Sequence, residues 1–333
     1  MHSRRDALTL LGLTSLLAGQ SLLCARAAAP AEPPPPGQGP ENGYTNGAVP
    51  ASETRHGGPN PDPWPNRKRL LIVADVQSGY HHDAINHTMG FVEELGRKSG
   101  AFITFLRTDS QLITKQKIAG QGKYEGRDNI NVKAMDYFDA IFLLPSGYGT
   151  MTEQQQNDLL SFVRDDGKGL IVGHASGAAF VRRDRSLTFP EWGNLIGGMM
   201  GGEFFARSRV IVEDPKFPGA MGWGKTSFDF TEQHPMTAMP FSRNIDHVIL
   251  RLDPKTVPVK SREAHPDGDF PVVWARQYGK GRVFNLGWGE FEETWDDPGF
   301  QKFIFGAIQW ALGSVQADVT PRPMPMGDMS RAM

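Results

Sequence analysis

The sequence has almost no cysteine: Cys24 is the only one in 333 residues, and it lies in an N-terminal segment that we expect to be removed. The mature chain would then lack thiols, which excludes disulfides, a thiolate nucleophile and cysteine-ligated metals. The chain also has little excess charge, because its formal net charge is −2 at pH 7. This balance gives no electrostatic reason to expect nucleic acid or an anionic membrane surface as a partner.

The N-terminus has no apolar run long enough for a membrane span of ~20 residues, since Leu8–Leu23 is interrupted by polar residues and glycines. This run follows the twin-arginine pattern at Arg4-Arg5 and precedes the small-residue site Ala25-Arg26-Ala27. Such a layout is typical of an export signal. We therefore expect residues 1–27 to be a twin-arginine signal peptide. The mature protein would be periplasmic or extracellular and would have no integral membrane segment.

Proline is concentrated in one stretch, because 11 of the 25 prolines lie between Pro30 and Pro65, among polar residues and glycines. Such a composition buries too little apolar surface to offset the entropy of ordering. We expect residues 28–66 to be a disordered, proline-rich linker and the Met- and Pro-rich residues 314–333 to be a disordered tail. The remaining residues, 67–313, are enough for one large domain.

Apolar runs and helical patterns alternate in the first half of that domain. The runs predict buried strands at Arg69–Asp75, Ala101–Leu106, Phe138–Leu144 and Gly169–Val172. Alternating strands and helices predict an α/β fold with a doubly wound, mostly parallel sheet of the flavodoxin-like kind. The second half, from about Arg207, is richer in strands, so we expect an antiparallel extension of the sheet there.

Reactive side chains follow the ends of four predicted strands. Tyr80, His82 and Asp83 follow the first strand, Tyr148 the third and His174 the fourth. A late hairpin, Pro271–Gln277 and Arg282–Leu286, leads into Trp288 and Glu290. Because the carboxyl ends of parallel strands meet at one edge, we expect these side chains to converge there.

Each of these side chains has a chemical interpretation and a plainer one. The candidates for acid or base catalysis are His82, Asp83, His174, Glu203 and Glu290. Three of them, His82, His174 and Glu290, are also candidate ligands of a divalent metal ion. The candidates for substrate binding are the aromatic residues Tyr80, Tyr148, Trp288 and Trp295. In the plainer interpretation, Asp83 interacts with a helix dipole, the glutamates are solvated and each tryptophan is a core residue.

Five segments together resemble the trehalose-utilisation (ThuA-like) family. They are GYHHDAI at 79–85, GHAS at 173–176, FPEWGNLIGG at 189–198, QHPMT at 233–237 and the stretch Phe270–Gly313. The resemblance implies a class I glutamine-amidotransferase-like fold and a role in carbohydrate utilisation. It also implies that His82 corresponds to the histidine that the family has after its first strand. His174 then corresponds to the family's histidine in the turn after the fourth strand.

The resemblance has two consequences for the chemistry. Amidotransferases of this fold carry their cysteine at the position of His174, so the chain is not expected to be a Cys-dependent glutamine amidotransferase. Glu203 and Glu290 stand where the family often has histidine. An anion there still permits acid, base or metal-ligand roles, but removes any role that needs imidazole.

Two functions from different classes follow from these observations. The first is an exported enzyme that acts on a sugar or keto-sugar derivative by acid/base or metal-assisted chemistry, as a lyase, isomerase or hydrolase of keto-glycosides. The second is a non-catalytic carbohydrate-binding protein on the same fold. Both have a small sugar or sugar derivative as partner. The sequence leaves the natural sugar, the metal and the oligomeric state open.

Overall fold

The computed structural model describes residues 66–324, apart from 125–126, 132 and 174–175, and describes only the backbone of residues 119–131. All described residues belong to one unit, Ala48–Met333. The predicted signal peptide, nearly all of the predicted linker and His174 lie outside the described residues. Their predictions therefore stay predictions.

The domain is built on a nine-stranded sheet with the order β2-β1-β5-β6-β11-β10-β9-β7-β8. The first five strands in this order are parallel and the remaining pairs are antiparallel. The strands are β1 (Lys68–Asp75), β2 (Phe102–Arg107), β5 (Ala140–Pro145), β6 (Gly169–Gly173), β7 (Met199–Val212), β8 (Ser227–Ala238), β9 (His247–Leu252), β10 (Pro271–Tyr278) and β11 (Gly281–Leu286). A separate hairpin pairs β3 (Ile118–Tyr124) with β4 (Arg127–Asn131). The predicted α/β fold, with an antiparallel extension after a mainly parallel start, is confirmed.

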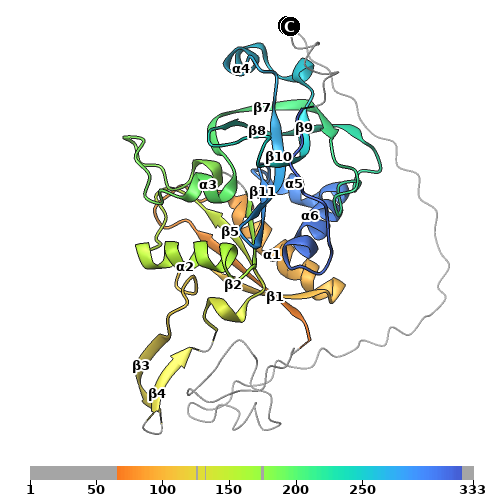
Figure 1. The fold of residues 1–333 in the computed structure, drawn as a ribbon. Coiled ribbons are helices and arrows are strands. Elements are labelled where there is room, and N and C mark those ends of the chain that lie inside the picture. The colour runs from red at the N-terminus through yellow and green to blue at the C-terminus, as the bar shows by residue number, and fades with distance from the viewer. Residues whose placement is uncertain (1–65, 125–126, 132, 174–175, 325–333) are drawn as a thin grey trace, which may run out of the picture. The chain divides into compact units, whose positions relative to one another are not determined.

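Helices lie on both faces of the parallel strands (Figure 1). The helices are α1 (Asp83–Ser99), α2 (Glu153–Arg164), α3 (Trp192–Ile196), α4 (Val259–Ala264), α5 (Glu292–Asp296) and α6 (Pro298–Ala311). Alternate residues of β1 divide the core, because Leu70 and Ile72 pack with α1 and α6, whereas Leu71 and Val73 pack with α2 and α3. No helix among the described residues is both long and apolar enough to cross a membrane.

Local sequence signals explain where the elements begin. Thr152 caps α2 with a full capping box, because its hydroxyl accepts from the Gln155 amide and the Gln155 side chain accepts from the Thr152 amide. Asp297 caps α6 through a single hydrogen bond, which its side chain accepts from the amide of Phe300. Pro298 occupies the first helical position. These caps fix the two helices that follow loops at the carboxyl edge of the sheet.

The loops after β1 and β5 are locked together at this edge. Gly79 and Gly147 pack back to back, and a Cβ atom on either residue would overlap the backbone of the other loop. Asp75 is fully buried at the end of β1 and accepts from the amide and the hydroxyl of Thr150 at 2.9 and 2.8 Å. The hydroxyl of Ser146 donates to the Tyr80 carbonyl at 2.8 Å. The segment that carries His82 is therefore fixed by the neighbouring loop.

The chain continues in a packed form beyond the expected end of the domain. We expected a disordered tail from residue 314, but Val319 and Met324 are buried. His247 contacts the Thr320 carbonyl through Nδ1 at 2.7 Å, and Arg322 lies 3.3 Å from Asp214. The expectation is wrong for residues 314–324, because a few well-placed apolar and charged side chains anchor a segment whose composition is typical of a loose tail.

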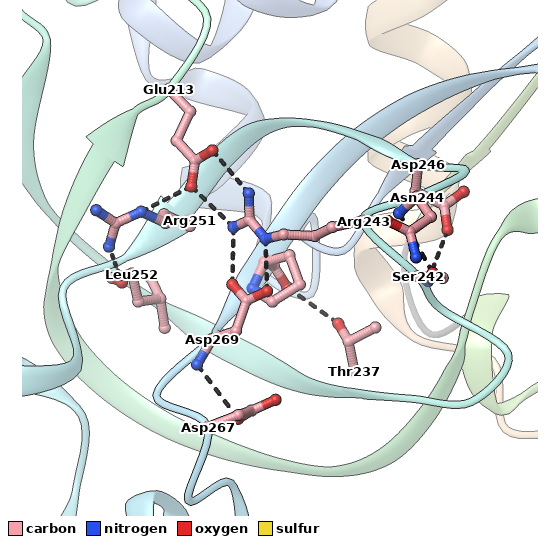
Figure 2. Close-up of polar contacts among 11 residues, drawn as sticks. Glu213, Thr237, Ser242, Arg243, Asn244, Asp246, Arg251, Leu252, Asp267 and Asp269 are labelled. Carbon is pink, nitrogen blue, oxygen red and sulfur yellow. Dashed lines mark hydrogen bonds and ion pairs between the residues drawn. The ribbon is translucent and has the colours of Figure 1, made fainter. Parts of the chain in front are cut away.

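Figure 2 shows a buried ionic network in the antiparallel half of the sheet. Arg243 donates to both oxygens of Glu213 at 2.9 Å and to both oxygens of Asp269 at 2.6 and 2.7 Å. Arg251, on β9, adds a second ion pair to Glu213 at 2.7 Å. The network joins β9 to the segments before and after it, and each carboxylate in it faces at least one guanidinium.

Candidate functional site

His82 and Glu290 form a close pair at the carboxyl edge of the parallel strands. His82 is the residue before α1, and its backbone is extended there because the helix begins at Asp83. Its Nδ1 lies 2.8 Å from Oε1 of Glu290, and the two side chains are 24% and 22% exposed. This distance allows a proton to be shared between them while solvent or a small molecule still reaches both.

Glu290 is held in place by the turn that follows β11. Gly289 has φ of +110°, and a Cβ atom there would lie 2.7 Å from the ring of Trp295, so a side chain would not fit. Trp295 donates from Nε1 to the Gly289 carbonyl at 3.2 Å. The turn thus rests on a buried indole and directs Glu290 toward the start of α1.

A second carboxylate, that of Glu232 on β8, lies behind this turn and is fully buried. It accepts hydrogen bonds from the Gln233 amide at 2.9 Å, from the Gly289 amide at 3.4 Å and from the Thr294 hydroxyl. Burial, with a smaller contribution from the charge of Glu290, raises the pKa of Glu232 to about 7. Glu232 therefore supports the Glu290 turn from inside the protein.

The carboxylates of the site keep their protons to unusually high pH. Burial raises the pKa of Glu290 to about 7, and the charge of Glu203 adds to this effect. Burial also lowers the pKa of His82, although the charge of Glu203 opposes it. These shifts reverse the usual order, because the pKa of Glu290, at about 7, lies above the lowered pKa of His82. Near neutral pH, the pair can therefore take up or release a proton at little cost.

Glu203 and Asp83 border this pair. Glu203 is exposed on β7, and its charge raises the pKa of both His82 and Glu290, so the three groups are electrostatic neighbours. Asp83 is exposed at the first position of α1, where a carboxylate also interacts favourably with the helix dipole. A second histidine-carboxylate contact lies further along α1, where His87 is 2.9 Å from Asp296 on α5.

The structure contradicts the prediction that Trp288 and Trp295 bind substrate. Trp288 and Trp295 are both fully buried, so neither ring offers a face to a sugar. Trp288 donates from Nε1 to Nδ1 of His234 at 3.1 Å and stacks on Phe230. The sequence reasoning placed both rings at the edge because they flank Glu290, but they form the core on which that edge rests.

The two predicted tyrosines are exposed but lie in different places. Tyr80 is 73% exposed, and the edge of its ring meets the ring of His82 at 4.5 Å between centroids. Tyr148 lines a hollow of about 650 Å³ with Arg182 and Glu191, and none of the residues around this hollow belongs to the His82–Glu290 pair. Of the two, Tyr80 is the one placed beside the candidate site.

Two of the three candidate metal ligands, His82 and Glu290, are among the described residues. The third, His174, lies outside them. The part of the chain that the structure describes has no group of three or more histidine, cysteine, aspartate or glutamate side chains arranged to hold an ion. His82 and Glu290 instead form a close histidine–carboxylate pair, with 2.8 Å between Nδ1 and Oε1.

Sequence reasoning missed the inward face of β8. Phe228, Phe230, Glu232 and His234 alternate along this strand and point the same way, so the apolar face ends in two buried polar residues. His234 is fully buried in β8, and burial lowers its pKa to about 4. A period-two apolar pattern that changes to glutamate and histidine is the signal that could have identified both.

Comparisons with known proteins agree with this architecture. The family model described as "ThuA: Trehalose utilisation" matches residues 69–311, and the chain therefore belongs to this family. Its fold is similar to that of a putative ThuA-like protein from Bacteroides uniformis, with 18% identity, a TM-score of 0.55 and coverage of 74% of this chain and 91% of that one. A putative ThuA-like protein from Parabacteroides merdae gives 13% identity, a TM-score of 0.52 and coverage of 78% and 94%. The comparison with curated proteins gave no match.

Proposed function

We propose that this protein is an enzyme of carbohydrate utilisation that moves protons on a sugar or keto-sugar derivative through His82 and Glu290. The contact of 2.8 Å between His82 Nδ1 and Glu290 Oε1, in a partly buried position where the glutamate has a pKa of about 7, carries the proposal. Groups that titrate near the working pH are the most effective general acids and bases. Membership of the trehalose-utilisation family supports a sugar as the substrate class.

The proposed reaction begins with removal of a proton from the carbon next to a carbonyl. The member of the pair that is deprotonated accepts this proton, and the electrons of the C–H bond form an enolate. When a glycosidic oxygen lies on the next carbon, its departure with the bonding electrons completes an elimination, and a protonated group returns a proton to the leaving oxygen. Reprotonation at another carbon would give isomerisation instead. His174 keeps the role of an additional acid or base that the sequence predicts for it.

The test is turnover of a 3-keto-glycoside by the purified mature protein and its Glu290→Gln variant. We expect kcat to fall by about 10² to 10⁴, the usual contribution of a general acid or base, because the amide cannot exchange a proton. Glu292→Gln is the matched control, since Glu292 lies exposed two residues along the same segment. Turnover that is unchanged in Glu290→Gln, with circular dichroism showing a folded protein, would reject the proposal.

The alternative is a non-catalytic sugar-binding protein on the same fold. In that case the wild-type protein binds sugars without turning any of them over, and His82→Ala and Glu290→Gln leave affinity unchanged. Export through the twin-arginine route belongs to the same proposal, since the signal pattern at Arg4-Arg5 supports a periplasmic or extracellular protein. Replacing both arginines by lysine should keep the protein inside the cell.

A further inference from the structure

An aromatic pocket of about 410 Å³ lies beside the His82–Glu290 pair. Its apolar wall consists of Phe205, Phe230 and Phe291. Phe205 is 61% exposed, which is unusual for a phenylalanine, and its ring meets that of Phe291 edge to face at 5.5 Å between centroids. The volume is within the range of ~300–1,000 Å³ that is usual for small-molecule pockets.

The pocket wall neighbours the candidate site along the chain, although the described residues that line the pocket do not include His82 or Glu290. Phe291 directly follows Glu290, and Phe205 lies two residues after Glu203 on β7, so Phe205 and Glu203 point to the same face of the strand. Thr294, which also lines the pocket, donates to Glu232 behind the Gly289 turn. The phenylalanine wall is thus an apolar surface that the fold places next to Glu290.

The charge around the pocket restricts what it can hold. Among the described residues that line it, Glu293 and Asp297 are acidic and none is basic. Asp297 is engaged inside the protein by Trp223 and by the amide of Phe300, but Glu293 is exposed at the rim. An anionic ligand would be repelled here, whereas carboxylates accept hydrogen bonds from hydroxyl groups.

We propose that this pocket is a subsite for the second ring of an uncharged disaccharide whose first ring lies at His82 and Glu290. The inference rests on the proposed function, because it places the reacting ring at that pair. The C–H face of the second ring would pack on Phe205 and Phe291, and its hydroxyl groups would donate to Glu293. Phosphorylated sugars would be excluded by the acidic rim.

Calorimetric titration of the Glu290→Gln protein tests the subsite without relying on turnover. Trehalose and glucose are the probes, and trehalose should bind more tightly because it fills both positions. Adding Phe205→Ala should weaken trehalose binding by about five- to tenfold, as expected for loss of one aromatic contact, and change glucose binding by less than about twofold. Val259→Ala is the matched control, because the exposed fraction of Val259, 60%, is close to that of Phe205. Val259 lies on α4 and does not line the pocket.

Several outcomes would overturn the subsite. They are equal effects of Phe205→Ala on both sugars, no measurable binding of trehalose, or binding of trehalose 6-phosphate as tight as that of trehalose. If light scattering shows a dimer that Phe205→Ala dissociates without any effect on sugar affinity, the wall is instead an interface between two copies. Full turnover in Glu290→Gln would reject the proposed chemistry, while the ratio of the two sugar affinities would still decide the subsite.

Discussion

Two groups of carboxylates in this domain differ in how their charge is balanced. In the network of Figure 2, Glu213 and Asp269 face Arg243, and Arg251 adds a second cation. At the edge of the parallel strands, Glu203, Glu232 and Glu290 are electrostatic neighbours of one another or of the histidine His82, and no guanidinium is among the causes of the pKa shifts of Glu232 and Glu290.

The pKa values show what this difference does. Burial alone would lower the pKa of Arg243, but its hydrogen bonds to Asp269 and Glu213 outweigh burial and raise it, so this network stays ionised. Burial raises the pKa of Glu290 and of Glu232 to about 7, so these groups change protonation near neutral pH. The first arrangement stabilises a fold, and the second provides protons for chemistry.

The largest expected effect comes from removing the cation of the compensated network. Arg243→Ala should lower the free energy of unfolding by about 3 to 5 kcal/mol, because it leaves Glu213 and Asp269 buried with too little positive charge. Urea denaturation followed by tryptophan fluorescence would measure it. Arg209→Ala is the control, since Arg209 pairs with Asp229 on an exposed strand surface and its loss should leave stability nearly unchanged. Equal stability of the two variants would mean that the network contributes nothing specific.

Glu290→Gln should have the opposite effect on stability, and the effect should depend on pH. The pKa of Glu290 is about 7 in the folded protein and near 4.5 when unfolded, so the folded state binds more protons between these values. Stability contributed by this group is therefore lost as pH rises from about 4.5 through 7. Since one pKa unit corresponds to ~1.4 kcal/mol and solvent screens part of the effect, the variant should gain about 1 to 2 kcal/mol over wild type at pH 8.

Urea denaturation of both proteins at pH 5 and pH 8 measures this gain. The comparison with wild type is needed because His234, whose pKa is lowered to about 4, makes the protein more stable as pH rises from about 4 to 6.5. That contribution is common to both proteins and cancels in the difference. A difference that does not grow between pH 5 and pH 8 would contradict the raised pKa of Glu290.

The sequence predicted β1, β5 and β6 well because each is an apolar run that is mostly buried on both faces. Leu70 to Ala74 in β1 are an example, since all five are fully buried. It also identified His82 and Glu290 as edge residues, because each lies in the glycine-containing loop that follows a strand. Their contact could not be predicted, since it depends on the Gly289 turn and on its packing against Trp295.

The aromatic residues show why the rest was missed. Trp288 and Phe205 both lie close in sequence to a candidate glutamate, yet Trp288 is fully buried and Phe205 is mostly exposed. Neither residue type nor distance along the chain decides which ring faces solvent. That depends on how β8 packs against the residues that follow β11, which is a contact between distant segments. Burial of Glu232 has the same origin, because its hydrogen-bond partners Gly289 and Thr294 lie more than fifty residues away.

The smallest expected effect concerns Asp214, a buried carboxylate whose arginine partner lies at the protein surface. Burial tends to raise the pKa of Asp214, but hydrogen bonds from His247 and the Lys216 amide, with the charge of Arg322, outweigh it and leave the pKa lowered. Arg322 is about half exposed, so Arg322→Ala should cost no more than about 1 kcal/mol of unfolding free energy at neutral pH. Because His247 still pairs with Asp214 at 2.9 Å, the segment up to Met324 should stay packed. Urea denaturation measures the cost, and hydrogen exchange at residues 315–320 reports the packing. A loss as large as that of Arg243→Ala would place Asp214 with the network of Figure 2 and would show that the exposure of the arginine partner does not separate the two cases.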